Sequence, residues 1–294
     1  MDARLTLTRP LELALTLAPV GTSGSLRLDG RDAWYATRTP LGPASAHLHQ
    51  DGDSIDVEAW GPGAGWLIAN VPSLCGEADD SSSFRPERGI VAELHRRHRG
   101  LRVPRTQAVF EALVPTVLTQ QVTTIEARAS YRAIVRAFGE QAPGPVSLVL
   151  PPAPAVLART PYWAFHRFGV ERRRADVIIR AARSAKRLEE TLTMSLPDAY
   201  ARLLAFPGVG AWSAAKVGLV AFGDPDAVPV GDYHLPHTVG YVLEGTPRST
   251  DERMLELLEP YHGHRGRVIR LITLSGLTAP KFGPHRPLRH IEKN

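Results

Sequence analysis

Two short stretches of the sequence hold the residues that are best placed to do chemistry. The first, LAFPGVGAWSAAKV at 204–217, puts a Pro-Gly-x-Gly turn between two apolar helical runs. The second, VPVGDYHLPHTV at 228–239, places Asp232 in a loop rich in glycine and proline. Backbone N–H groups at a helix hairpin lack intrahelical partners, so they attract a phosphate oxygen without reading any base. An aspartate at a helix N-terminus stays ionised at neutral pH, since its ordinary pKa is about 3.9.

Two helices flank the turn of the first stretch. Ser195 is the expected N-cap of the first helix, and Asp198 three positions later gives it a capping-box-like start. Gly208 and Gly210 are expected to adopt conformations that a residue with a Cβ resists. A second helix is predicted from about 211 to 222, which makes the whole segment a helix hairpin.

The loop after the second helix determines where the aspartate lies. That helix spans roughly 16 Å at about 1.5 Å per residue. The loop GDPDAVPVG at 223–231 is long enough to fold back along it. We therefore expect Asp232 to lie near the hairpin.

The composition is that of an ordinary globular protein with a basic balance. The chain has 294 residues, 43% of them hydrophobic, and a formal net charge of +5. A basic balance favours polyanionic partners but also occurs on solvated surfaces. One stretch, residues 85–105, concentrates arginines that form either a charged helix end or phosphate contacts; they are Arg85, Arg88, Arg96, Arg97, Arg99, Arg102 and Arg105.

Cysteine content and hydropathy exclude several classes of protein. Cys75 is the single cysteine, which excludes a disulfide framework, a cysteine-rich zinc site and a four-cysteine iron–sulfur cluster. This usage fits a reducing cytoplasm. Glu12 and the arginines and prolines near it interrupt the N-terminal apolar segment, so we expect no signal peptide. No apolar run reaches the ~18 residues that cross a bilayer, so we expect no membrane partner.

Hydrophobic periodicity divides the chain into a β-rich part and a helical part. Residues 3–70 contain six short alternating runs, which predict an antiparallel sheet with one buried face; they are RLTLTR, LELALTLA, SLRLD, AWYATRT, SAHLHQ and SIDVEAW. GEADDSSS at 76–83 is typical of a linker. Helical spacing follows at 110–138, with a break around 119–124, and at 172–188. We predict an α+β fold, with an N-terminal antiparallel β-sheet domain at 1–80 and a mainly α-helical domain of two lobes at 85–294.

The motifs resemble those of the helix-hairpin-helix (HhH-GPD) DNA glycosylase superfamily. Within it, the chain looks like 3-methyladenine DNA glycosylase II, the alkylation-repair branch. Members of that branch carry a preceding sheet domain, so the resemblance extends over nearly the whole chain. It implies a helix-hairpin-helix at about 195–222 and a Gly/Pro-Asp loop at 223–232. The similar segments are GLRVPRT at 100–106, VLTQQVT at 117–123, FPGVGAWSAAKV at 206–217 and VGDYHLP at 230–236.

The resemblance implies roles for three residues of the reacting centre. Asp232 matches the catalytic aspartate, which stabilises oxocarbenium character on the sugar and orients a water molecule. Its alternative role is to cap a helix that starts at Tyr233. Trp212 stands where bifunctional members carry a Schiff-base lysine and where monofunctional alkylpurine glycosylases have tryptophan. Its ring can stack on a base and attract positive charge, or it packs the two helices together. Tyr233 is expected to line the same pocket.

The resemblance also implies contacts with the rest of the DNA. Gln121 stands where the family places a residue that fills the gap left by an extruded nucleotide. Gln120 can exchange roles with it, and the alternative is a glutamine pair on a solvated helix end. Relatives carry a structural monovalent cation on backbone carbonyls around Phe206 and Val209, and such a cation is possible here. The hairpin residues implied to bind DNA phosphate are Pro207, Gly208, Val209, Gly210 and Trp212.

The chain departs from the family pattern at two places. Lys216 lies one helical turn after Trp212, where relatives can carry an aromatic residue. It can contact phosphate, shape the base pocket or attack the sugar as a desolvated amine. The helix at 263–276 lacks a tryptophan that the best-known member has there. Both changes remove aromatic surface, so they leave the range of excised bases open.

Two further sets of residues are assigned no role in the reaction. His234 and His237 lie three positions apart without a nearby third ligand, so we predict no metal site. Five aromatic residues are expected in the core rather than at a ligand; they are Trp60, Trp66, Tyr162, Trp163 and Phe165.

The function implied by the resemblance is a monofunctional DNA glycosylase of base excision repair. It would flip an alkylated purine such as 3-methyladenine or 7-methylguanine out of double-stranded DNA and hydrolyse its glycosidic bond. No redox cofactor and no nucleotide cofactor are implied, and a monomer is expected. The alternatives are a glycosylase with lyase activity through Lys216, a non-catalytic module that binds damaged DNA, and a protein-interaction scaffold. Action on ethenoadenine, hypoxanthine or 1-methyladenine stays open.

Overall fold

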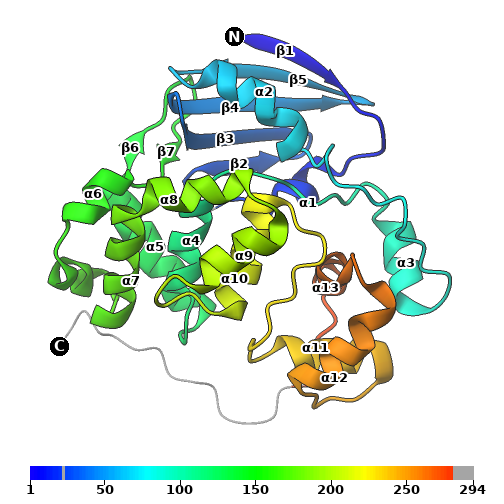
Figure 1. Ribbon diagram of the computed structural model, residues 1–294. Coiled ribbons are helices and arrows are strands. Elements are labelled where there is room, and N and C mark those ends of the chain that lie inside the picture. Colours follow the sequence, from blue (N-terminus) through cyan, green and yellow to red (C-terminus); the bar gives the residue numbers. More distant parts are fainter. Residues whose placement is uncertain (22–23, 281–294) are drawn as a thin grey trace.

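The N-terminal part of the protein is a five-stranded antiparallel sheet. A computed structural model describes residues 1–21 and 24–280. The strands lie in the order β1-β5-β4-β3-β2 (Figure 1). Alternating side chains of the sheet pack with α1 (Leu13–Leu17) and α2 (Ala64–Leu74) into one hydrophobic cluster. The strand bounds are β1 Asp2–Thr6, β2 Leu26–Asp29, β3 Asp32–Thr39, β4 Gly42–Asp51 and β5 Ser54–Trp60.

The predicted antiparallel sheet is confirmed, with two corrections. The run LELALTLA at 11–18 is not a strand, because its centre forms α1. Leu13 and Leu17 stand four residues apart and are both buried, so a helical turn brings them to one side. The end of the predicted β-rich range, from Ala64, is helical as well and forms α2. Alternation over a few residues does not separate a strand from a short buried helix.

The rest of the chain is mainly helical, which confirms the α+β class. The break predicted within 110–138 lies between α4 and α5, and the basic helix predicted at 172–188 is α7 followed by α8. The remaining bounds are α3 Gly89–Arg97, α4 Val109–Leu118, α5 Thr124–Phe138, β6 Glu140–Gln141, β7 Val149–Leu150, α6 Pro154–Arg159, η1 Tyr162–Phe168, α7 Arg172–Arg183, α8 Ala185–Glu189, η2 Glu190–Thr193, α9 Leu196–Leu204, α10 Ala211–Val217, η3 Gly218–Phe222, α11 Leu235–Glu244, α12 Asp251–Leu258, η4 Glu259–Tyr261 and α13 Arg265–Leu274.

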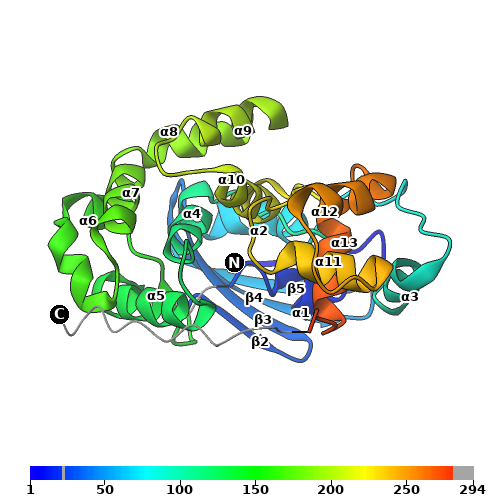
Figure 2. The same cartoon turned by 90° about the horizontal axis from the view of Figure 1, so that it is seen from below.

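Two separate hydrophobic clusters hold the helices together. One cluster joins α4 through α10, and we call this group the first lobe. The other joins α3, α11, α12 and α13, and we call it the second lobe. Figures 1 and 2 place the two lobes side by side, with the sheet packed along them. The domain boundaries at 1–80 and 85–294 stay a prediction.

Buried ion pairs attach the segment at 76–83 to both parts of the chain. Arg102 is almost completely buried, bonds to Glu77, and also donates to the backbone oxygen of Pro10 at 3.1 Å. Asp79 is buried and accepts from Arg267 and from the Val103 backbone N–H, the latter at 2.8 Å. The guanidinium of Arg102 is therefore a structural group, which removes it from the expected phosphate contacts. Contacts at Glu77 and Asp79 therefore hold the segment predicted to be a linker.

Two of the aromatic residues expected in the core lie on the surface. Trp163 is 65% exposed and Tyr162 is 37% exposed, whereas Phe165 is fully buried. Trp163 and Phe165 stand two residues apart in η1, where about three residues complete a turn, so they face different directions. Tyr162 is the first residue of η1. Arg172 lies over the Tyr162 ring at 4.6 Å. Trp60 and Trp66 are partly buried. No helix of the described chain is long and apolar enough to cross a membrane.

Candidate active site

The hairpin forms as predicted, and one of its two glycines is required by the geometry. Ser195 caps α9, since its Oγ accepts from the Asp198 backbone N–H at 3.3 Å. Gly208 has φ +95°, and a Cβ there would lie 2.4 Å from Cγ2 of Val177 on α7. Gly210 differs from our expectation, because it is extended (φ −102°, ψ −177°) and a Cβ would meet nothing within 4 Å. Only Gly208 therefore has to be glycine.

Side chains from two other elements hold the carbonyl groups of the hairpin turn. Arg180 on α7 donates from Nη1 to the Pro207 oxygen at 2.9 Å. Gln120 donates from Nε2 to the Gly208 oxygen at 3.0 Å and to Ser213 Oγ at 2.9 Å. Gln120 is thus committed to positioning the turn.

Gln121 lies at the tip of the turn between α4 and α5. Its backbone is left-handed, with φ +58°, and its side chain is exposed. A non-glycine residue in this region costs about 1 kcal/mol. The next helix starts rigidly, because Thr123 and Glu126 form a complete capping box. The two glutamines that the sequence left interchangeable are therefore distinct in the structure: Gln120 bonds to the hairpin turn, and Gln121 is the exposed one.

Asp232 lies next to the hairpin, as the loop length predicts. Its Oδ2 accepts from Nε1 of Trp212 at 2.9 Å, across the two lobes. Its Oδ1 accepts from the backbone N–H groups of His234 and Leu235 at 2.9 and 3.0 Å. The helix it precedes, α11, begins at Leu235 rather than at Tyr233. The carboxylate thus supports the start of α11 and bonds to the hairpin tryptophan at the same time.

The surroundings of Asp232 keep its carboxyl group ionised. Burial would raise the pKa of this partly buried group. The hydrogen bond from Trp212, the two backbone N–H groups and the charge of Lys216 outweigh burial, so the pKa of Asp232 lies below its ordinary value. A carboxylate of this kind can stabilise positive charge that develops within a few ångströms of it.

Lys216 and Tyr233 complete the immediate neighbourhood of the aspartate. Lys216 is exposed on α10, and its Nζ lies 5.9 Å from the centre of the Trp212 ring. Tyr233 is 80% exposed, and its ring meets His234 and His237 edge-on at 4.8 and 6.3 Å between ring centres. No group of three or more metal-ligating side chains occurs among residues 1–21 and 24–280.

Three polar contacts fix the loop that carries Asp232. The Tyr200 hydroxyl donates to Asp224 at 2.6 Å, and Arg265 donates from Nε to Asp226 at 2.9 Å. The Gly231 backbone N–H donates to Asp251 at 3.0 Å. Sequence reasoning missed these supports, because the partners stand 20 to 39 residues apart and form no local motif.

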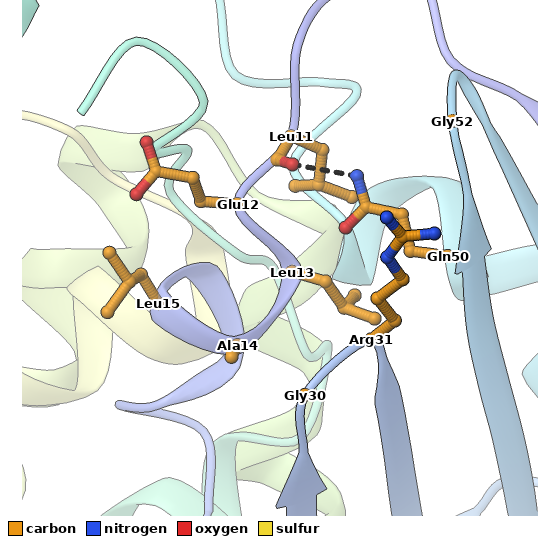
Figure 3. Close-up of a pocket in the computed structure, with 9 residues that line it drawn as sticks. All are labelled: Leu11, Glu12, Leu13, Ala14, Leu15, Gly30, Arg31, Gln50 and Gly52. Atoms are coloured by element: carbon orange, nitrogen blue, oxygen red, sulfur yellow. Dashed lines mark hydrogen bonds between the residues drawn. The ribbon is translucent and has the colours of Figure 1, made fainter. Parts of the chain in front are cut away.

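A pocket of about 410 Å³ lies elsewhere in the protein, between α1 and the turns that join β2 to β3 and β4 to β5. Figure 3 shows Gln50 donating to the backbone oxygen of Leu11, a bond of 2.8 Å. Glu12 and Arg31 line the same pocket. None of its lining residues belongs to the candidate site.

Comparison with known proteins gives related sequences and similar folds. The chain is 30% identical over 149 residues to DNA-3-methyladenine glycosylase 2 of Escherichia coli K12, covering 49% of this chain and 52% of that protein. The chain is a relative of the DNA-3-methyladenine glycosylases. This confirms the superfamily and the branch that the motifs indicated. The chain spans about half the length of the curated relatives it matches. No family model matches it.

Two solved glycosylase structures share the fold over almost the whole chain. The 3-methyladenine DNA-glycosylase from Archaeoglobus fulgidus superposes with a TM-score of 0.79 at 19% identity, covering 93% of this chain and 98% of that one. The 8-oxoguanine glycosylase/lyase from Clostridium acetobutylicum, in complex with double-stranded DNA, has a TM-score of 0.71 at 13% identity, covering 94% and 97%. At these identities the likeness establishes the fold.

Proposed function

We propose that the protein is a monofunctional DNA glycosylase that excises alkylated purines from double-stranded DNA. The observation that carries the proposal is the hydrogen bond between Trp212 and Asp232, which joins the hairpin of the first lobe to the Gly/Pro loop of the second. The relationship to the DNA-3-methyladenine glycosylases supports the same reaction. The protein would act as a monomer in the cytoplasm, and hydrolysis of a glycosidic bond requires no redox or nucleotide cofactor.

The proposed reaction uses the charge of Asp232. As the bond between C1′ and the purine nitrogen breaks, both electrons leave with the base and positive charge develops on the sugar. The ionised carboxylate stabilises that charge and orients the water molecule that adds to C1′. Trp212 fixes the direction of the carboxylate and offers its ring to the extruded base. Tyr233 is exposed beside the site and offers a second aromatic surface.

The DNA would reach this site along the hairpin and α7. The hairpin backbone would bind a phosphate, and Gln121 would enter the gap that the flipped nucleotide leaves. Arg180 joins the hairpin to α7, and Arg173 lies exposed two turns before it. The acidic residues within 159–188, Glu171 and Asp176, both lie within ion-pair distance of arginines. The exposed cations of this surface are Arg159, Arg167, Arg172, Arg173, Arg180, Arg183, Lys186 and Arg187.

Base release measures the proposed activity directly. Randomly methylated duplex DNA is incubated with wild type or Asp232→Asn, and the freed bases are resolved by chromatography. We expect wild type to free methylpurines, and Asp232→Asn to bind the DNA while releasing at least about 100-fold less, because the neutral amide cannot stabilise the sugar cation. Binding by both proteins without any base release would contradict the enzyme and favour a module that only binds DNA.

Borohydride trapping separates hydrolysis from lyase chemistry. A lyase forms a Schiff base between a lysine amine and the sugar, and borohydride reduces it to a stable protein–DNA adduct. We expect no adduct, because the position that would carry the lysine holds Trp212. An adduct that disappears in Lys216→Gln would replace the monofunctional proposal with the bifunctional one.

A further inference from the structure

Lys216 places a positive charge at the proposed base-binding surface. Trp212 and Lys216 stand four residues apart on α10, so both side chains lie on one face of the helix. The Lys216 Nζ is 5.9 Å from the centre of the indole ring, whose N–H donates to Asp232. The ammonium and the carboxylate therefore both lie beside one indole. A base stacked on that ring meets a site close to neutral rather than one with a net negative charge.

Damaged purines differ in the charge that they carry into such a site. A purine alkylated at N3 or N7 is cationic while it is attached to the sugar and leaves as a neutral base. A deaminated or etheno-bridged purine is neutral while attached, and the electron pair of the broken bond makes it anionic as it leaves. Relative to free enzyme and free DNA, a nearby ammonium destabilises the transition state of the first kind, whose base still carries part of its positive charge, and stabilises that of the second, whose base carries partial negative charge.

We propose that Lys216 determines specificity by favouring damaged purines that are neutral in DNA over those that are cationic. This inference rests on the proposed glycosylase activity and names the substrate class that its site prefers. The positive charge that develops on the sugar is common to both classes, so it cancels when the two are compared. The preference of Lys216 for one class over the other therefore depends only on the charge of the base.

The expected size of the preference follows from the distance. For the charge of a base that contacts Trp212 we take the separation from the ammonium to be ~6 Å, like that of the ring itself. With an effective dielectric constant of about 40, between the values for water and for a protein surface, this interaction changes the ratio of rates about tenfold. Because Lys216 is exposed, its removal should leave folding unchanged.

The experiment compares two substrates in four proteins. Release is measured with the enzyme in excess of the DNA but below saturation, so that the rate reports kcat/KM, on duplexes that carry one hypoxanthine or one 7-methylguanine at the same position. The proteins are wild type, Lys216→Gln, Lys216→Arg and Arg27→Gln, the last an exposed cation on the edge strand β2, outside the proposed DNA path. We expect the ratio of hypoxanthine rate to 7-methylguanine rate to fall about tenfold in Lys216→Gln. Lys216→Arg and Arg27→Gln should keep it within about twofold of wild type, since both retain the charge beside Trp212.

The outcomes separate this inference from the function on which it rests. A ratio in Lys216→Gln within about threefold of wild type, with both bases released, would overturn the role of Lys216 while leaving the glycosylase intact. A ratio that falls equally in Lys216→Arg would also overturn it, because shape rather than charge would then set the preference. Failure of wild type to release either base would remove the proposed function itself.

Discussion

Replacing Trp212 by phenylalanine should shift the pH dependence of catalysis. The substitution keeps an aromatic ring on α10 and removes the indole N–H that donates to Oδ2 of Asp232. The bond favours the ionised carboxylate, and its loss leaves burial opposed by the two backbone N–H groups and Lys216 alone. The pKa of Asp232 should therefore rise. Since the ionised form is the active one, the acid limb of the pH–rate profile should move to higher pH.

The size of the shift follows from the strength of the bond. Hydrogen bonds to charged groups contribute about 1.5 to 3 kcal/mol. Asp232 is only partly buried, so solvent weakens the bond, and we take about 1.4 kcal/mol. That energy corresponds to about one pH unit. The rate of Trp212→Phe relative to wild type should thus fall about tenfold on the acid limb beyond any constant factor at neutral pH.

Single-turnover release of hypoxanthine from about pH 4 to about pH 8 measures the shift. Trp163→Phe is the matched control, because it removes an indole N–H from an exposed residue that has no contact with Asp232. A ¹³C NMR titration of the Asp232 carboxyl gives the same quantity without DNA. Superimposable profiles for Trp212→Phe and wild type, whatever their absolute rates, would refute the reasoning and leave Trp212 a base contact alone.

Three further predictions concern stability and DNA binding. Burial raises the pKa of Glu111 to about 7, so the folded state retains a proton that the unfolded state has lost. The free energy of unfolding should fall by up to about 3 kcal/mol as pH rises from about 4.5 to about 7, and urea titrations of Glu111→Gln should lose most of that slope. Gly208→Ala should cost about 2 kcal/mol or more, and Gly210→Ala less than about 0.5 kcal/mol, in the same titrations. If α7 contacts DNA phosphates, Arg173→Ala should reduce the slope of log Kd against log salt by about 0.9, and Arg27→Ala on the edge strand β2 should not.

Each of these has a result that contradicts it. Equal costs for the two glycine variants would show that the contact with Val177 does not constrain the turn. An unchanged pH slope in Glu111→Gln would assign the slope to another carboxyl group. Equal salt slopes for the two arginine variants would remove α7 from the proposed DNA path.

Elements whose conformation depends on neighbouring residues could be predicted from the sequence. Elements whose conformation depends on tertiary packing could not. Five alternating runs became strands, and the capped start of α9 formed at Ser195, because each depends on neighbouring residues. The run at 11–18 has the same alternation and became α1, because burial of Leu13 and Leu17 decided its conformation. The position of Trp163 also could not be predicted from its neighbours in the sequence. Its size suggests the core, and the geometry of η1 turns it to the surface.

The sequence was enough to predict which residues of the candidate site lie close together. It was not enough to predict the individual hydrogen bonds between them. The lengths of α10 and the following loop were enough to bring Asp232 to the hairpin. They could not indicate that the Trp212 N–H points at the carboxylate, or that Gln120 bonds to the turn while Gln121 is exposed. Such details depend on rotamers and on contacts between residues nearly a hundred positions apart, for which a single sequence carries no local signal.

The position of the reactive carboxylate depends on how the two lobes are held together. Asp232 precedes α11, whose core belongs to the second lobe, while Trp212 lies on α10 of the first. The loop between them is attached to both, through Tyr200 of the first lobe and Arg265 of the second. A small displacement of one lobe would therefore lengthen the bond from Trp212 to Asp232 and raise the pKa of the carboxyl group. Asp226, through which Arg265 holds the loop, should consequently affect the pH dependence of the reaction although it is not part of the proposed base-binding surface.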